Sequence, residues 1–394
     1  MSQVRRRLVL YLSGFDPRGV RYYHQLYRNE AAKQAEVSGY RIDVGKRERI
    51  ANHVLRWDVR FEGDGESVDT EYLYCEWDDI VRHFWVKSPI ELAGVTLTAS
   101  WRAIRAGVFT KTFQWSWPAG VTATMPVVVI LGLIVLILGM AAGGFLLFGL
   151  WGLLGGVALG CGTLWLAYRL EQKFNLTWVG RILSFHEREE QSRTHMLDKR
   201  RDAFGELLVQ CLARDDIDEV VVAGHSYGAV LAIGVVARTL EAAKTSDAKL
   251  SLLTLGQTIM WLAWLPGATA MREEIAATAE ADHIDWVDFS APPDGACFAL
   301  VDPYTAIGGR QTDRKNPKLL NAKFHEIMKP QKFTRRNRDW MELHFQYIMA
   351  TVKRSDFDFF AITAGQQTLG ERYAHRPSVR DFTRLRRGKA KALR

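Results

Sequence analysis

The sequence predicts an α/β fold, a mostly parallel β-sheet flanked by helices, into which a pair of apolar helices is inserted. Three observations predict it. Short apolar runs typical of buried strands alternate with longer segments of helical periodicity. One such run, Val220–Ala223, leads through a glycine-bounded turn into an apolar helical segment at 227–238. An uncharged stretch from Thr112 to Tyr168 interrupts the alternation.

The elements before the insertion begin with a buried strand at 8–12, which ends in Ser13–Pro17 and is followed by a helix from about Arg21 to Val37. Further strands are expected at 40–44, 53–61 and 71–77, with a turn at 62–65 between the last two and a helix from Asp78. After the insertion, apolar residues at helical spacing predict a helix over 196–212, and strands are expected at 250–255 and 284–289.

The turn at 224–228 reads Gly-His-Ser-Tyr-Gly. A serine at the tip of a sharp strand-to-helix turn has a strained backbone, and the turn closes only when the residues two before and two after it are very small. Gly224 and Gly228 occupy those places. The pattern predicts a nucleophile elbow with Ser226 as the nucleophile, and the alternative is a tight turn with an idle serine.

The segments 220–238 and 8–16 resemble the α/β-hydrolase superfamily, and within it the serine esterases and lipases that carry G-H-S-x-G. The resemblance implies a Ser/Asp/His triad in that chain order and an oxyanion hole made by two backbone N–H groups. Here these donors would be the N–H of Tyr227, directly after the nucleophile, and the N–H of Phe15 in the loop of an early strand. No cofactor is expected. No metal is expected either, because His186-Glu187-Arg188-Glu189-Glu190 lacks the second histidine of H-E-x-x-H.

The acid of the triad is expected in the loop Ser290–Gly295, after the strand at 284–289. The carboxyl ends of parallel strands meet at one edge of a sheet, which is the edge that carries the nucleophile. Asp294 is the first choice, because two prolines stiffen the approach to it and the following glycine permits a tight bend. Asp288 is the second choice and Asp302 the third. Asp294 as a simple turn residue is the alternative.

The base is expected to be His344, near the start of an amphipathic helix in the segment 340–349. Its H-x-x-Y pattern resembles the final histidine motif of class 3 lipases, although Gln257–Met260 stands where those lipases usually have S-P-R-V-G. The other histidines after Ser226 fit less well. His283 precedes its strand, His325 lies in a polar connection, and His375 falls in the basic C-terminal region.

The uncharged stretch predicts a transmembrane helical hairpin. Its two halves, 121–140 and 145–168, each supply the roughly 20 apolar residues that a span requires, with a turn at 141–144 between them. Tryptophan and tyrosine residues mark both ends, and basic residues flank both ends, so the positive-inside rule places the rest of the chain in the cytoplasm. These flanking residues are Arg102, Arg105, Lys111, Arg169, Lys173 and Arg181. A buried core hairpin is the alternative.

The chain is therefore divided into residues 1–111 and 169–380, which form one hydrolase-like domain, a membrane hairpin at 112–168 and a basic tail at 381–394. Four scattered cysteines suit a reducing compartment. The net charge of +8 is partly carried by the tail, in which no aromatic residues alternate with the charges. Nucleic acid is therefore not an expected partner.

These features together predict a serine hydrolase that is anchored in an inner or plasma membrane, faces the cytoplasm and cleaves carboxylic esters. The expected substrate is a lipid or a small ester, although thioester or amide cleavage would use the same residues. The alternative is a catalytically silent module of the same fold that binds a ligand or a membrane protein. The oligomeric state is left open.

Overall fold

The computed structural model describes residues 3–63, 65–174, 177–191, 195–310, 314–333 and 339–379. Within them, nine strands form one sheet in the order β2-β4-β5-β1-β6-β7-β8-β9, with β3 paired to β4. The strands are β1 (Arg6–Leu12), β2 (Arg41–Val44), β3 (Glu48–Ala51), β4 (Val54–Gly63), β5 (Glu66–Cys75), β6 (Glu219–His225), β7 (Lys249–Leu255), β8 (Asp285–Ser290) and β9 (Lys318–Asn321).

The sheet is mostly parallel. Strands β5, β1, β6, β7, β8 and β9 all run in one direction, and β4 is antiparallel to β5 as well as to β2 and β3. Every residue of the central strand β6 is buried, as expected for a strand covered on both faces. The α/β class predicted from the sequence is confirmed. Strands β3 and β9 were not predicted.

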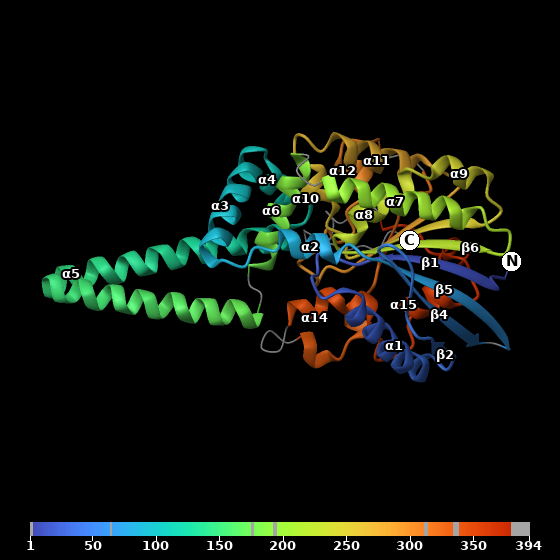
Figure 1. Ribbon diagram of the computed structural model, residues 1–394, viewed down its shortest axis with the longest axis horizontal. Helices are drawn as coiled ribbons and strands as arrows, with labels where there is room; N and C mark the ends of the chain where they lie inside the picture. Colours follow the sequence, from blue (N-terminus) through green and yellow to red (C-terminus); the bar gives the residue numbers. More distant parts are fainter. Residues whose placement is uncertain are drawn as a thin grey trace.

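Helices cover both faces of the sheet. In Figure 1, α7, α8 and α11 lie on one face and α1 and α15 on the other. The helices other than α5 are α1 (Gly19–Ser38), α2 (Asp78–Phe84), α3 (Pro89–Arg105), α4 (Val108–Trp115), α6 (Trp178–Glu190), α7 (His195–Leu212), α8 (Gly228–Ala237), α9 (Leu240–Thr245), α10 (Ile259–Ala263), α11 (Thr269–Glu280), α12 (Pro303–Ala306), α13 (Phe324–Ile327), α14 (Trp340–Phe345), α15 (Phe359–Ala364) and α16 (Leu369–Arg372).

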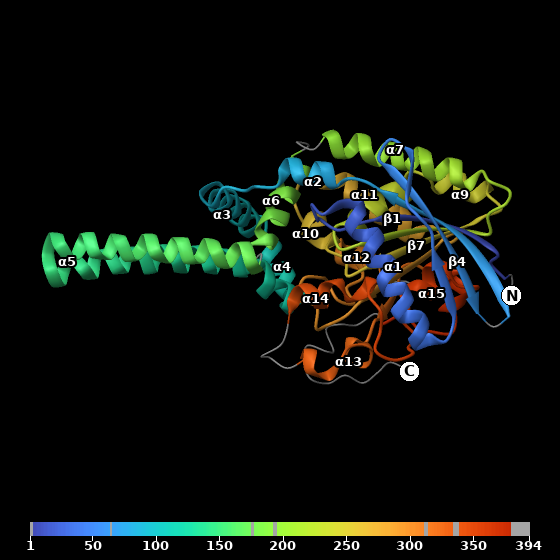
Figure 2. The same cartoon turned by 60° about the horizontal axis from the view of Figure 1, so that its bottom comes forward.

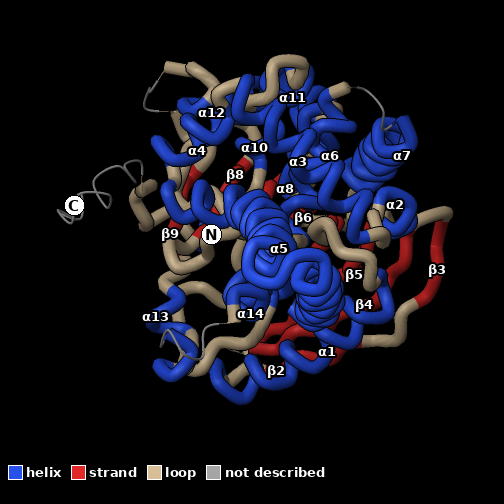
Figure 3. Tube along the Cα trace, turned by 90° about the vertical axis from the view of Figure 1, so that its left-hand side faces the viewer, coloured by secondary structure: helices blue, strands red, loops and turns tan. Residues whose placement is uncertain are grey.

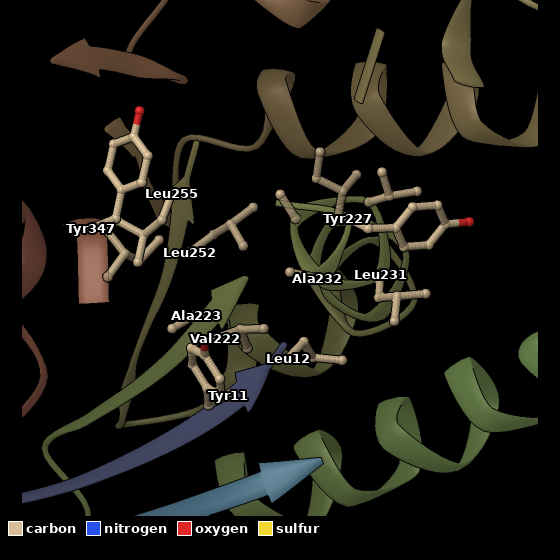
Figure 4. Close-up of a cluster of buried hydrophobic side chains, with 14 of the residues drawn as sticks. Tyr11, Leu12, Val222, Ala223, Tyr227, Leu231, Ala232, Leu252, Leu255 and Tyr347 are labelled. Carbon is tan, nitrogen blue, oxygen red and sulfur yellow. The ribbon is translucent and has the colours of Figure 1, made fainter. Parts of the chain in front are cut away.

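The core is built where α8 packs against the centre of the sheet. Leu12 of β1, Val222 of β6, and Leu231 and Ala232 of α8 are all at most 1% exposed, and Figure 4 shows them in one cluster. Because α8 is apolar on all sides, it can be stable only as a fully buried helix.

A buried ion pair joins the amino-terminal ends of β1 and β6. The Arg7 guanidinium contacts the Glu219 carboxylate at 2.8 Å, and both side chains are fully buried. Arg7 also donates to the carbonyl oxygens of Gly365 and Gln367, and Glu219 accepts from the backbone N–H of Leu369. These hydrogen bonds offset the cost of burying two charges, and they attach the C-terminal segment to β1 and β6.

Helix α5 (Trp117–Phe174) projects from one end of the body (Figures 1 and 2). Its stretch Trp117–Glu171 is the one helix of the described residues that is long and apolar enough to cross a membrane, and only 6% of its most apolar window is buried. Large apolar side chains such as Leu146 and Trp151 are more than four-fifths exposed. Such a surface calls for an apolar environment.

The helix is bent at Gly149, whose φ of 61° and ψ of −140° interrupt the helical geometry. The expected turn at 141–144 is therefore wrong, since alanine and glycine continue the helix there. The two arms lie side by side (Figure 1). A Cβ added to Gly144 would come within 2.1 Å of the Gly152 carbonyl oxygen, and one added to Gly160 within 2.9 Å of Ile137. The chain thus forms two helical arms that meet at the bend at Gly149.

The glycine that begins α8 is required by the packing of the turn. A Cβ on Gly228 would lie 2.0 Å from the backbone oxygen of Leu12, so we expect Gly228→Ala to lower the free energy of unfolding by about 3 kcal/mol or to prevent folding. The matched control is Gly205→Ala in α7, where the nearest atom would be 3.7 Å away. The control should change stability by at most about 1 kcal/mol. Thermal unfolding of both variants in detergent checks this, and equal melting temperatures would contradict it.

Candidate active site

Ser226 follows β6 directly and has the geometry of a strained turn. Its φ is 57°, which is uncommon for a residue other than glycine. A hydrogen bond of 2.8 Å from its backbone N–H to the Leu255 carbonyl oxygen fixes this conformation. Helix α8 begins two residues later, at Gly228. The hydroxyl is thereby presented at the carboxyl edge of the parallel strands.

Both flanking glycines are needed for this turn to close. A Cβ on Gly224 would lie 2.4 Å from the Gly228 carbonyl oxygen and 2.7 Å from Ala229. A Cβ on Gly228 would collide with Leu12, the residue of β1 that lies opposite Gly224 in the sheet. Residues 224 and 228 therefore sit where only glycine fits, as the elbow pattern requires.

Asp294 and His344 meet at the same edge. Asp294 lies in the loop after β8, and His344 lies on α14. The distance between His344 Nδ1 and Asp294 Oδ2 is 2.9 Å, with both side chains almost completely buried. Burial raises the pKa of Asp294, but the charge and hydrogen bond of His344 outweigh this effect and leave the pKa below its usual value. The carboxylate is thus ionised beside the imidazole.

The alternative acids and bases lie elsewhere. Asp288 accepts hydrogen bonds from the hydroxyls of Thr254 at 2.6 Å and Ser290 at 3.1 Å. Asp302 caps α12 and pairs with Arg314. His325 is exposed and lies 3.6 Å from Glu326. Among the described residues, Asp288 and Asp302 form no hydrogen bond or ion pair with His344, and His325 forms none with Asp294.

The loop that carries Phe15 runs beside the serine. A Cβ on Gly14 would lie 3.1 Å from Ser226 Cβ and 3.5 Å from its Oγ, so glycine permits this close approach. Two buried indoles hold the loop by its carbonyl oxygens, since Trp77 Nε1 donates to Ser13 and Trp178 Nε1 donates to Phe15, each at 2.9 Å.

The backbone N–H groups of Phe15 and Tyr227 form no hydrogen bond within the described chain. Two such donors beside a serine hydroxyl can stabilise a negative oxygen that develops there. Tyr227 is itself fixed by its side chain, whose hydroxyl donates to Glu189.

Two further residues belong to this site although sequence analysis gave them no role. His225 Nε2 lies 2.8 Å from the backbone oxygen of His344, and the two rings are 4.9 Å apart. Burial lowers the pKa of His225 to about 3, so the ring is neutral and donates this hydrogen bond. Trp178 packs edge-on at 6.4 Å from the His344 ring. In the sequence, only the position of His225 inside the pentapeptide 224–228 points to a role for it. No local sequence pattern marks Trp178.

The base of α5 contacts the same site. A Cβ on Gly295, next to Asp294, would lie 2.8 Å from Thr122 Oγ1. At the other end of the same helix, Thr177 and Trp178 follow the second arm. One end of α5 therefore contacts the loop of Asp294, and Trp178, which packs against His344, follows the other end in sequence.

The arrangement can support nucleophilic chemistry. With Nδ1 of His344 bonded to the carboxylate, Nε2 is the nitrogen left to exchange a proton with a hydroxyl. Among the described residues, no hydrogen bond joins Ser226 Oγ to His344, and such contacts often tighten only when substrate binds. Within the same residues, no group of three or more His, Cys, Asp or Glu side chains is placed to hold a metal ion.

Comparisons of this chain with protein-family models, with curated proteins and with solved structures gave no match.

The buried Asp288 makes stability depend on pH. Burial raises its pKa from an ordinary 3.8 to about 7. Between pH 3.8 and about 7, Asp288 keeps its proton in the folded chain and releases it in the unfolded chain. The contribution of protonated Asp288 to the free energy of unfolding is therefore complete below pH 3.8 and is lost as the pH rises through about 7. We expect the melting temperature of Asp288→Asn to rise relative to wild type as the pH is raised from about 5 to about 8. A constant difference between the two proteins over this range would contradict the assignment.

Proposed function

We propose that this protein is a membrane-anchored serine hydrolase of the α/β-hydrolase type that cleaves carboxylic esters, with Ser226 as nucleophile, His344 as base and Asp294 as the acid of the triad. The observation that carries the proposal is the buried 2.9 Å contact between His344 and Asp294, at the sheet edge where Ser226 has a φ of 57°. The chain order Ser, Asp, His is that of the superfamily.

The residues support a two-step reaction. Ser226 Oγ bonds to the ester carbonyl carbon while its proton passes to His344 Nε2, and Asp294 stabilises the imidazolium. The N–H groups of Tyr227 and Phe15 bind the oxyanion. The C–O bond to the alcohol then breaks, and the alcohol leaves with the proton from His344. Water, deprotonated by His344, releases the acid from the acyl-enzyme and restores Ser226.

The position of α5 favours a lipid ester. Its base contacts the loop of Asp294, so a substrate partitioned in the bilayer would reach the site over a short path. The uncharged arms also supply the length for two crossings. The first arm, 117–148, is about 48 Å long, against about 30 Å of hydrocarbon. Basic residues at both ends favour the cytoplasmic side for the hydrolase domain.

The first test concerns the three triad residues. We expect a fluorophosphonate to label wild type and to leave Ser226→Ala unlabelled. His344→Ala and Asp294→Asn should lower kcat/KM for a soluble ester by factors on the order of 10³ to 10⁴. The matched controls are His325→Ala and Asp288→Asn, which should retain activity near wild type. Equal labelling of wild type and Ser226→Ala would favour a catalytically silent binding module.

The second test concerns the membrane anchor and its orientation. A cysteine in place of Lys353, outside α5, should react with an impermeant thiol reagent only after cell lysis if the domain is cytoplasmic. Replacing 131–168 with a flexible linker, which keeps Thr122 and the buried base of α5 in place, should release the domain from membranes and spare hydrolysis of a short soluble ester, because the triad and the residues that pack on it lie outside this segment. Labelling of this cysteine before lysis would contradict the cytoplasmic orientation of the domain. Equal losses on short and long-chain esters would remove the support for a lipid substrate.

A further inference from the structure

Helix α3 has two apolar faces, and only one of them is used in the fold. Its inward face packs on α6 and carries Leu92, Ala99 and Ala103, which are at most 4% exposed. Its outward face carries Ile90, Trp101 and Ile104, which are 85%, 60% and 52% exposed. The three outward residues are separated by 11 and 3 positions, and at 3.6 residues per turn this spacing places them in one stripe along the helix.

Helix α3 lies at the end of the body from which α5 projects. Figures 1 and 2 show α3 beside the base of α5, and Figure 3, viewed from the side of α5, shows it on the facing surface. Helix α3 contacts both α4 and α5. The helix that carries the stripe therefore lies beside the base of α5, on the side where a bilayer crossed by α5 would begin.

The charged residues of the segment that carries the stripe are mostly positive. The segment 86–117 contains four basic residues and one acidic residue, Glu91. Arg102 is neutralised by Glu187. The other three, Lys87, Arg105 and Lys111, form no ion pair within the described part of the chain. A helix with an aromatic apolar stripe and flanking cations is typical of one that lies in the headgroup region of an anionic membrane.

We propose that the outward face of α3 lies on the anionic headgroup surface of the bilayer that α5 crosses, with Trp101 and Ile104 inserted between lipids. The proposal rests on the membrane insertion of α5 proposed above. It fixes the orientation of the domain, because a body held at both α3 and α5 cannot swing freely on the anchor. The edge of the sheet with Ser226 is then kept close to the lipid surface.

The test uses the full chain in vesicles of phosphatidylcholine with and without phosphatidylglycerol. Cys161, the exposed cysteine of the described residues, is replaced by serine, and an environment-sensitive fluorophore is attached at Trp101→Cys. Lipids with a spin label near the headgroup should quench this fluorophore, more strongly in the anionic vesicles. The matched control is Glu241→Cys on α9, at the opposite end of the body (Figure 1), where no quenching is expected.

A third site separates this proposal from the anchor itself. A fluorophore at Leu136→Cys on α5 should be quenched by lipids labelled deep in the acyl chain. If position 136 is quenched and position 101 is not, the docking of α3 is overturned while the anchor stands. If neither is quenched, membrane insertion of α5 fails, and the docking of α3 fails with it. Fluorophosphonate labelling of the same proteins reports on Ser226 independently.

Substitution of a basic residue near the stripe tests the electrostatic part of the proposal quantitatively. Arg105→Gln should lower the ratio of docked to undocked α3 in anionic vesicles about fivefold, the factor that corresponds to about 1 kcal/mol for one basic residue near such a surface. The matched control is Lys244→Gln on α9, which should leave the ratio unchanged. An equal response to both substitutions, or quenching at 101 that is independent of anionic lipid, would overturn electrostatic docking.

Discussion

The contact between the backbones of β1 and α8 is the constraint on which the site depends. Gly228 lies so close to the Leu12 carbonyl oxygen that no side chain fits between them, and Gly224 likewise leaves no room for a side chain against the first turn of α8. This packing forces the chain to reverse within two residues, and the reversal gives Ser226 its positive φ. It also brings the loop after β1 beside the serine, because Leu12 and Gly224 are paired in the sheet. Ser226 and the N–H groups of Tyr227 and Phe15 are therefore placed by one packing arrangement.

Residues that this arrangement determines locally could be predicted from the sequence. The strand, the two glycines and the apolar helix are contiguous, so their pattern predicted the tight turn at Ser226 that the structure has. The rule that parallel strands end at one edge was enough to choose the loop of Asp294. His344 was harder, since it follows the short strand β9 and a connection without strong periodicity. The prediction of His344 as the base depends on the resemblance of its H-x-x-Y pattern to the final histidine motif of class 3 lipases.

Other features could not be predicted because they depend on contacts between distant segments. Asp288 was a reasonable second acid by position, but its side chain points to Thr254 of the neighbouring strand and is used inside the sheet. Trp178 holds the carbonyl oxygen of Phe15 across 163 positions of sequence. The bend of α5 falls at Gly149, although the nearby Gly143 and Gly144 have the same intrinsic freedom. Gly144 instead lies where the two arms pack, since a Cβ there would be 2.1 Å from the Gly152 carbonyl oxygen.

The placement of α5 connects the proposed membrane anchor with the proposed hydrolase site. An anchor that served only to tether the domain could be attached to any surface loop, yet here its first arm touches the loop of Asp294 and its second arm leads into Trp178, which covers His344 and holds Phe15. If α5 and α3 sit in a bilayer as proposed, a change in their position would shift the contacts of Asp294, His344 and the loop of Phe15. Because Ser226 and His344 are each only 2% exposed, substrate must displace some of these covering groups to enter. In the proposed arrangement, the groups to be displaced are the ones that adjoin the lipid.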